Sequence, residues 1–473
     1  MKNYTRLAEV QADLQSKSIN CNELVQSYLN RIEDQKHLNA FIETFDESAL
    51  DQARKIDEKI SGGEKLGELF GLVIAIKDNI CFKGHKIQAS SQILNSFESI
   101  YSSTVVDRLV AADAIIIGRT NCDEFAMGSS NENSSLGTVL NPIDESRVPG
   151  GSSGGSSAAV KADLCMASLG SDTGGSIRQP ASFCDVVGFK PSYGRVSRYG
   201  LIAYASSFDQ IGPFTKSVED SARILKVIAG HDQMDPTSSL VETENYSEIT
   251  ALDKPSKFAL IREIYEHEGL DPEIKKYTDD WVAKLREKGH TIALIDFPYL
   301  DYLIPTYYVL TTAEASSNLS RYDGVRYGYR SSDANDMEEV YTQSRSEGFG
   351  KEVKNRIMLG TFVLSSGYYD AYYTKGQKVR RLVSDAVAEI FKSYDFIINP
   401  TTPEFPFKFG EKSSDPVRMY LSDIYTVLAN LNGSPAISLP LYRNEEGLPA
   451  GMQIMANRFE EKKLLDCAAS MMS

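Results

Sequence analysis

Two short loops rich in glycine and serine constrain the fold of this chain more than any other feature. Residues 150–157 read Gly-Gly-Ser-Ser-Gly-Gly-Ser-Ser, and residues 170–176 read Gly-Ser-Asp-Thr-Gly-Gly-Ser. Glycine lets backbone N–H groups turn inward and approach a ligand closely, and serine adds hydroxyl groups among them. Such a pair of loops is typical of a serine nucleophile that lies beside its own oxyanion hole.

A flexible linker is the commonest alternative for a run of glycine and serine. The flanking residues argue against it here. Residues 158–162 have a composition that favours a helix, and residues 164–169 have the pattern of a short buried strand that leads into the second loop. Both loops are therefore expected to belong to a packed structure rather than to a linker.

Helical and strand patterns alternate along most of the chain. Two helices are expected within residues 5–35, the second starting at an Asn20–Glu23 capping box, and the region 303–391 is mostly helical with a Tyr- and Arg-rich patch at 321–330. We expect further helices at 105–112 and 272–288, and apolar strands at 72–76, 114–118, 258–261, 291–295, 396–400 and 436–440. This pattern predicts an α/β protein with a largely buried sheet to which both ends of the chain contribute.

Composition narrows the possible partners and the compartment. The 473 residues carry a net charge of −15, which disfavours this chain as the main surface for nucleic-acid phosphates. The six cysteines form no CxxC or CxC spacing, and no secretion signal precedes residue 10, so we expect the reducing environment of the cytoplasm. No apolar run approaches a transmembrane length, and we expect no membrane partner.

A serine nucleophile needs a base, and histidine is the usual one. None of the five histidines lies between residues 85 and 231, and no G-x-S-x-G elbow surrounds Ser176. Lys77 is the better candidate because it ends the apolar run 72–76, where α/β sheets place functional groups. Burial would lower its pKa enough for it to accept a proton, and Ser152 could relay that proton from Ser176.

These loops resemble the signature of the amidase signature family, from Gly150 to Ala158 and from Gly170 to Pro180, together with residues 75–78. The resemblance implies a Ser–cis-Ser–Lys triad, with Ser176 as nucleophile, Ser152 as relay and Lys77 as base. It also implies an oxyanion hole made by the N–H groups of Thr173, Gly174, Gly175 and Ser176. The implied fold is a large mixed sheet with helices on both faces. We expect one domain over 1–473, with an N-terminal helical segment at about 1–60 and a helical insertion at about 300–391.

Further motifs resemble the glutamine-hydrolysing A subunits of tRNA-dependent amidotransferases within that family. They lie at 121–128, 314–324 and 356–360, although residues 137–140 read Gly-Thr-Val-Leu where a proline-containing stretch is expected. The resemblance implies that Arg356 holds the α-carboxylate of glutamine and that Asp423 holds its α-ammonium, which suits the chemistry of both side chains. A structural ion pair is the alternative for each. Weaker candidates for the pocket are Glu124, which could also be a surface charge, Ser129 and Tyr307.

Partners follow from the same resemblance. This chain would release ammonia from glutamine, and no P-loop for ATP is present in its sequence. A B-type partner would bind tRNA and use ATP and Mg²⁺ to amidate Glu-tRNA(Gln), or Asp-tRNA(Asn), and a small C-type partner would join the other two chains in a heterotrimer. The chain itself would carry no metal and no cofactor. Two alternatives stay open: a free-standing amide hydrolase of the same family, and a non-catalytic scaffold whose loops bind anions.

Overall fold

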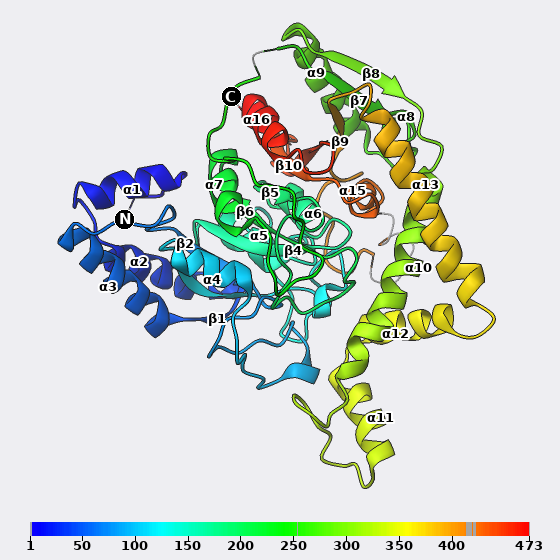
Figure 1. Cartoon of the computed structure of the whole chain (residues 1–473), viewed down its shortest axis with the longest axis horizontal. Coiled ribbons are helices and arrows are strands. Elements are labelled where there is room, and N and C mark those ends of the chain that lie inside the picture. The colour runs from blue at the N-terminus through cyan, green and yellow to red at the C-terminus, as the bar shows by residue number, and fades with distance from the viewer. Residues whose placement is uncertain (1, 253, 413–418, 420–421, 473) are drawn as a thin grey trace.

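The structure is a computed structural model that describes residues 2–252, 254–412, 419 and 422–472. Its centre is a mixed sheet of eleven strands in the order β1-β3-β2-β4-β6-β5-β10-β11-β9-β7-β8 (Figure 1). The strands are β1 (Phe41–Thr44), β2 (Val73–Lys77), β3 (Ile115–Thr120), β4 (Ala167–Asp172), β5 (Val187–Lys190), β6 (Gln210–Thr215), β7 (Lys257–Ile261), β8 (Thr291–Ile295), β9 (Phe396–Pro400), β10 (Ala436–Arg443) and β11 (Pro449–Met455).

Helices connect and cover these strands. They are α1 (Leu7–Gln15), α2 (Cys21–Asp34), α3 (Asp46–Gly62), α4 (Thr104–Ala111), α5 (Gly154–Lys161), α6 (Arg178–Phe183), α7 (Val218–Ile228), α8 (Arg262–Tyr265), α9 (Pro272–Glu287), α10 (Leu300–Asn318), α11 (Met337–Gly348), α12 (Lys351–Leu364), α13 (Lys375–Ile390), α15 (Val427–Leu431) and α16 (Glu461–Met472). Short helical turns are η1 (Lys36–Leu38), η2 (Gln92–Leu94), η3 (Glu124–Ala126), η4 (Leu319–Arg321) and η5 (Asp370–Thr374). In the described residues, no helix combines the length and apolarity that a membrane span requires.

Both faces of the sheet are buried. Along β7, Phe258 and Leu260 join one hydrophobic core, whereas Ala259 and Ile261 join a second core. Successive strand residues point to opposite faces, so two separate cores along one strand mean that each face is covered. On β9, Ile397 likewise belongs to the second core, whereas its neighbours Phe396 and Ile398 belong to the first. This arrangement confirms the predicted large mixed sheet with helices on both faces.

Three neighbouring parallel strands position the candidate site. β2 pairs in parallel with both β3 and β4, so the carboxyl ends of all three strands lie at one edge of the sheet. Lys77 is the last residue of β2, the segment 121–129 follows β3, and the second Gly/Ser-rich loop follows β4. Only residues 150–153 of the first Gly/Ser-rich segment form a loop, because residues 154–157 are the first turn of α5, which contacts β2, β3 and β4. Residues far apart in sequence therefore meet at this edge.

Most of the predicted elements are present, including both N-terminal helices and the Asn20–Glu23 capping box. The strand predicted at 164–169 is displaced, because β4 begins only at Ala167. Asp163 has a left-handed backbone with φ of 57°, which turns the chain after α5 and delays the strand. β1, β5, β6 and β11 were not predicted, since glycine, proline and polar residues interrupt their apolar pattern.

The buried centre of β3 generates a stability prediction. Ile116 is fully buried, and we expect Ile116→Ala to lower the free energy of unfolding by about 2–5 kcal/mol, because it removes apolar contacts and leaves a cavity. Ile100→Ala is the matched control, since Ile100 is 80% exposed and its truncation should change stability by less than about 0.5 kcal/mol. Denaturant titration measures both. Equal losses in the two variants would contradict the assigned burial.

Candidate active site

Lys77 lies fully buried at the carboxyl end of β2. Its Nζ donates hydrogen bonds to the hydroxyls of Ser152 (2.7 Å), Ser153 (2.9 Å) and Ser171 (3.0 Å). Burial lowers the pKa of Lys77 to about 8, while the surrounding Cys122 and aspartate groups oppose this shift. Since all three of these partners are neutral hydroxyls, a neutral amine can persist at this position and accept a proton.

The two serines that the resemblance assigns to the triad differ in accessibility. Ser152 follows a cis peptide bond with Gly151 and is fully buried against Lys77. Ser176 lies in the second loop and is 8% exposed. A relay must be enclosed and a nucleophile must meet its substrate, so the difference matches the predicted roles. The structure thus brings Lys77 and Ser152 into contact, and the roles of the three residues stay a prediction.

A buried ion pair braces the second loop. Arg178 and Asp172 are both fully buried and share a two-pronged contact, with Nε to Oδ2 at 3.1 Å and Nη2 to Oδ1 at 3.0 Å. The Asp172 carboxylate also accepts the backbone N–H groups of Gly175 (2.9 Å) and Ile177 (3.1 Å). Burial alone would raise the pKa of Asp172, but Arg178 outweighs it and holds the value at about 2.

Because of this ion pair, the four predicted donors of the oxyanion hole are not equivalent. The N–H of Gly175 already points at Asp172, so it is a poor donor for a substrate oxyanion. In the described chain, no hydrogen bond engages the N–H of Gly174 or of Ser176. The hydroxyl of Thr173 donates to Asp209, which fixes that residue beside the loop. In the described residues no hydrogen bond engages the N–H of Thr173 either, so Thr173, Gly174 and Ser176 are the predicted donors whose N–H groups are available to a developing negative charge.

Arg356 and Asp423 face one buried region from different elements. Arg356 projects from α12, where its Nε donates to Glu352 (2.7 Å) and its Nη1 donates to the hydroxyl of Tyr204 (2.8 Å). Asp423 accepts a hydrogen bond from the hydroxyl of Ser129 at 2.6 Å. Burial raises the pKa of Asp423 to about 7, although Ser129 and the positive charge of Arg356 act to lower it. The carboxylate is therefore poised to bind a cationic group.

Tyr307 and Glu124 occupy different surroundings. A side chain at Gly174 would lie only 2.5 Å from the Tyr307 hydroxyl, so this tyrosine covers the oxyanion loop directly. Glu124 is buried rather than a surface charge, and its carboxylate accepts the N–H of Gly350 (2.8 Å) and the hydroxyl of Ser91. Burial raises the pKa of Glu124 to about 7. Its contacts join η3 to the start of α12, and none of them reaches the triad or Asp423.

Several residues of the site were not predicted from the sequence. Ser153 and Ser171 complete the hydroxyl cage around Lys77. Gln179 joins the first Gly/Ser-rich loop to the segment after β3, because its Oε1 accepts the N–H of Gly151 and its Nε2 donates to the carbonyl of Ser129. Their positions within the matched motifs were a signal, but the motifs alone assign them no contact. In the described residues, no cluster of three or more His, Cys, Asp or Glu is arranged to hold a metal ion.

Comparison with known proteins gives this geometry a family. The family model described as Amidase matches residues 23–465. The chain belongs to the amidase family. The A subunit of a glutamyl-tRNA(Gln) amidotransferase from Chlorobium phaeobacteroides is 50% identical over 99% of this chain and 98% of that protein. The crystal structure of the corresponding A subunit from Thermotoga maritima is 40% identical and superposes with a TM-score of 0.78, covering 95% of this chain and 91% of that one.

A more distant neighbour helps to rank the alternatives. An inhibitor-bound chain from a vestigial protein complex, described in connection with the origins of an s-triazine catabolic enzyme, superposes with a TM-score of 0.86. It covers 100% of this chain and 98% of that one, but is only 27% identical. The higher identity of the amidotransferase A subunits places this amidase-family chain with them, and a free-standing hydrolase has less support. The chain is an amidase-signature enzyme, which argues against a scaffold without activity.

The two perturbed pKa values predict how activity depends on pH. We expect kcat/KM for glutamine, the substrate that the resemblance implies, to rise with pH through about 7 to about 8 and then to level off. Lys77 acts as a base only when neutral, and Asp423 binds a cation only when ionised. Protonation of either group therefore lowers kcat/KM as the pH falls. Initial rates of ammonia release between about pH 6 and about pH 10 measure this profile.

Asp423→Asn separates the two contributions. It should remove the pH dependence near 7 and raise KM, while kcat keeps the step near 8 that belongs to Lys77. Ser221→Ala is a suitable control, because Ser221 is a buried serine whose hydroxyl bonds that of Thr215 and neither titrating group. A rate that falls as pH rises across this interval would show that both assignments are wrong.

Proposed function

We propose that this chain is the glutaminase component of a tRNA-dependent amidotransferase, hydrolysing glutamine to glutamate and ammonia. The observation that carries the proposal is the contact between the buried amine of Lys77 and the hydroxyl of Ser152, at 2.7 Å, beside the loop of Ser176. The identity with amidotransferase A subunits supports the choice of glutamine as the amide. The chain acts in the cytoplasm as one domain over 1–473.

The proposed reaction begins with proton transfer. Neutral Lys77 takes a proton from Ser152, which in turn takes the proton of Ser176, and the Ser176 oxygen attacks the side-chain amide carbon of glutamine. The N–H groups of Thr173, Gly174 and Ser176 stabilise the tetrahedral oxyanion, each donor contributing about 3–4 kcal/mol. The relay returns the proton to the leaving nitrogen, so ammonia departs. Water then cleaves the glutamyl ester, which releases glutamate and restores Ser176.

Two opposite charges orient the substrate in this scheme. The α-carboxylate of glutamine pairs with Arg356, and its α-ammonium pairs with Asp423. Ser129 holds the Asp423 carboxylate at 2.6 Å, and Tyr204 holds the Arg356 guanidinium at 2.8 Å, so both charges have a fixed place before substrate arrives. Tyr307 closes the wall above Gly174. The proposal leaves Glu124 a positioning role, between η3 and α12, outside direct contact with glutamine.

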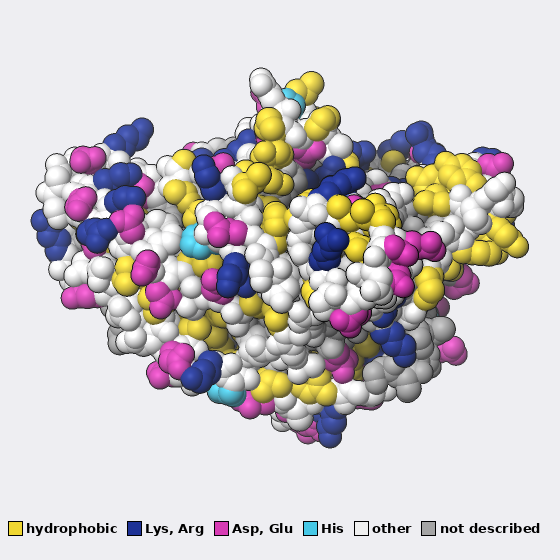
Figure 2. Space-filling model, turned by 90° about the horizontal axis from the view of Figure 1, so that it is seen from below, with side chains coloured by type: hydrophobic (Ala, Val, Ile, Leu, Met, Phe, Trp, Pro, Cys, Tyr) yellow, Lys and Arg dark blue, Asp and Glu magenta, His cyan; other side chains and the backbone are white. Residues whose placement is uncertain are grey.

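Partner chains would use the ammonia. We propose a B-type partner that binds tRNA, ATP and Mg²⁺ and amidates Glu-tRNA(Gln), or Asp-tRNA(Asn), and a small C-type partner that completes a heterotrimer. An exposed apolar surface supports a partner. It consists of Met358, Leu359 and Phe362 on α12 with Tyr368, Tyr369 and Tyr372 beside it, and Figure 2 shows hydrophobic side chains gathered at this end of the molecule. Tyrosine, phenylalanine and methionine are enriched in interface cores.

Ser176→Ala tests the nucleophile. We expect it to lower kcat for glutamine hydrolysis by at least about 10⁴-fold, because no ester can form, while glutamine still binds through Arg356 and Asp423. Calorimetric titration measures binding and ammonia release measures turnover. Ser157→Ala is the control, since the Ser157 hydroxyl donates to the carbonyl of Gly154 and lies outside the proposed relay. Full hydrolysis by Ser176→Ala would refute the triad.

The apolar surface yields a separate prediction. Phe362 is 42% exposed, and we expect Phe362→Asp to reduce co-purification with the B- and C-type partners, because a charge would be buried in the interface. Leu240→Asp is the control, since Leu240 is 80% exposed and lies outside this apolar surface. Affinity capture of the co-expressed complex measures both. Equal capture of the Phe362 variant and the unaltered chain would remove this surface from the interface.

A further inference from the structure

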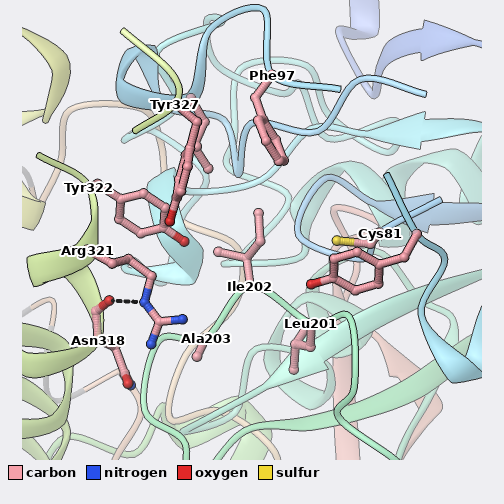
Figure 3. A pocket seen from close by; sticks show the side chains of 11 residues that line it. Cys81, Phe97, Leu201, Ile202, Ala203, Asn318, Arg321, Tyr322 and Tyr327 are labelled. Carbon is pink, nitrogen blue, oxygen red and sulfur yellow. Dashed lines mark hydrogen bonds between the residues drawn. The ribbon is translucent and has the colours of Figure 1, made fainter. Parts of the chain in front are cut away.

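A cavity of about 160 Å³ lies apart from the proposed triad and glutamine pocket (Figure 3). Aromatic rings from two segments form its walls: Phe97 and Tyr101 from one, Tyr322 and Tyr327 from the other. Ile202 forms part of its apolar floor, and Arg321 lies at its side. None of the residues assigned to the triad, the oxyanion loop or the glutamine pocket lines this cavity. Three of its lining residues, Arg321, Tyr322 and Tyr327, belong to the Tyr- and Arg-rich patch at 321–330, to which the proposed reaction assigns no role.

Hydrogen-bond donors converge on this cavity. The Nε of Arg321 donates to the carbonyl of Asn318 at 2.9 Å, and in Figure 3 the other end of the guanidinium extends into the space beside Ala203. Neither Nη group pairs with a described residue, and the same holds for the hydroxyls of Tyr322 and Tyr327. Arg321 lines the same cavity as Tyr101 and Tyr322, so its guanidinium lies near both tyrosines.

This lining defines a class of ligand. An arginine with two unused donor groups recognises a carboxylate or phosphate, and the tyrosine hydroxyls can donate to the same anion. Aromatic walls favour a flat ring. The volume is close to that of a cavity of about 150 Å³ known to hold one benzene ring. Arg321 is exposed to solvent, so a bare inorganic anion would contact it without filling the aromatic walls, and an uncharged ring would fill the walls without contacting it.

The cavity is connected to the glutamine pocket through one segment of chain. Ile202 and Ala203 line the cavity, and the next residue, Tyr204, binds Arg356 through its hydroxyl at 2.8 Å. Asn318 also lines the cavity and donates to the carbonyl of Tyr204 at 3.2 Å. A ligand that shifts Ala203 or Asn318 therefore acts on the residue that holds Arg356.

We infer that this cavity is an effector site for a small organic anion, consisting of one flat ring that bears a carboxylate or a phosphate. Arg321 binds the anion, the aromatic side chains hold the ring, and occupancy changes the affinity for glutamine through Tyr204. The effect on glutamine rests on the proposed function, whereas binding of the anion does not.

Calorimetric titration of the full chain tests the site with four probes. Benzoate and phenyl phosphate carry a ring with an anion, inorganic phosphate carries only the anion, and benzyl alcohol carries only the ring. We expect benzoate or phenyl phosphate to bind at least about tenfold more tightly than either half-probe, and the stronger of the two identifies the anion. Absence of binding by both, or equal binding of inorganic phosphate, would overturn the site.

Variants locate the binding. Arg321→Gln should weaken the better probe at least about tenfold, and Tyr327→Ala should weaken it by removing one wall. Arg330→Gln is the matched control, because Arg330 is exposed in the same segment and does not line the cavity. Thermal midpoints of the variants show that each is folded. An equal loss in Arg321→Gln and Arg330→Gln would reduce the interaction to nonspecific charge attraction and overturn the proposal.

Glutamine kinetics test the coupling. The better probe should change KM for glutamine in the unaltered chain and should leave kcat nearly unchanged, and Arg321→Gln should abolish this response. Binding without a change in KM would overturn the effector role. If the chain hydrolyses no glutamine at all, the proposed function fails, but the titration still decides whether the anion binds.

Discussion

The buried ion pair of Asp172 and Arg178 holds the rest of the site in place. Asp172 ends β4, and its carboxylate fixes the backbone on both sides of Ser176 by accepting the N–H groups of Gly175 and Ile177. Arg178 extends the same network to the far side of the sheet edge, through the carbonyl of Thr426 (2.7 Å) and the side chains of Gln453 (2.6 Å) and Asn430 (2.7 Å). A buried pair costs desolvation energy that excellent geometry and further hydrogen bonds must offset. Here these contacts also hold the loop around Ser176 in one conformation, so the desolvation energy of the pair is offset by a preorganised site.

Contrasting environments lower the pKa values of two neighbouring buried groups for different physical reasons. Asp172 stays ionised because Arg178 compensates its burial, whereas Lys77 has hydroxyl partners and burial favours its neutral form. Proton transfer from a serine requires this separation, since a carboxylate bonded to Nζ would keep the amine charged. The three serines around Lys77 satisfy its hydrogen bonds without supplying a counter-charge. Serine density near residue 152 thus has a chemical reason beyond backbone flexibility.

The sequence predicted those parts of the molecule that local patterns control. Apolar runs located β2, β3 and β7, and the strand-end position of Lys77 led to its contact with Ser152. Burial of Glu124 was not predictable, because its partners Gly350 and Ser91 come from other parts of the chain. The loss of Gly175 as an oxyanion donor depends on a side chain three residues earlier, and motif matching gives no direction to either group. Long-range hydrogen bonds thus account for what sequence patterns missed.

Two buried carboxyl groups with similarly raised pKa values show why burial alone does not define a binding group. The Gly350 N–H is shared between the two carboxylate oxygens of Glu124, and the Ser91 hydroxyl donates to one of them, so two fixed donors already share its charge. For Asp423, Ser129 supplies a single hydroxyl at one oxygen, and Arg356 acts on it from across the pocket. In the proposed scheme the substrate ammonium pairs with Asp423, and the substrate carboxylate joins Arg356, which already forms an ion pair with Glu352. Under that proposal, an amide without an ammonium group would leave Asp423 to take up a proton instead, and the pocket would favour a free amino acid over a simple amide.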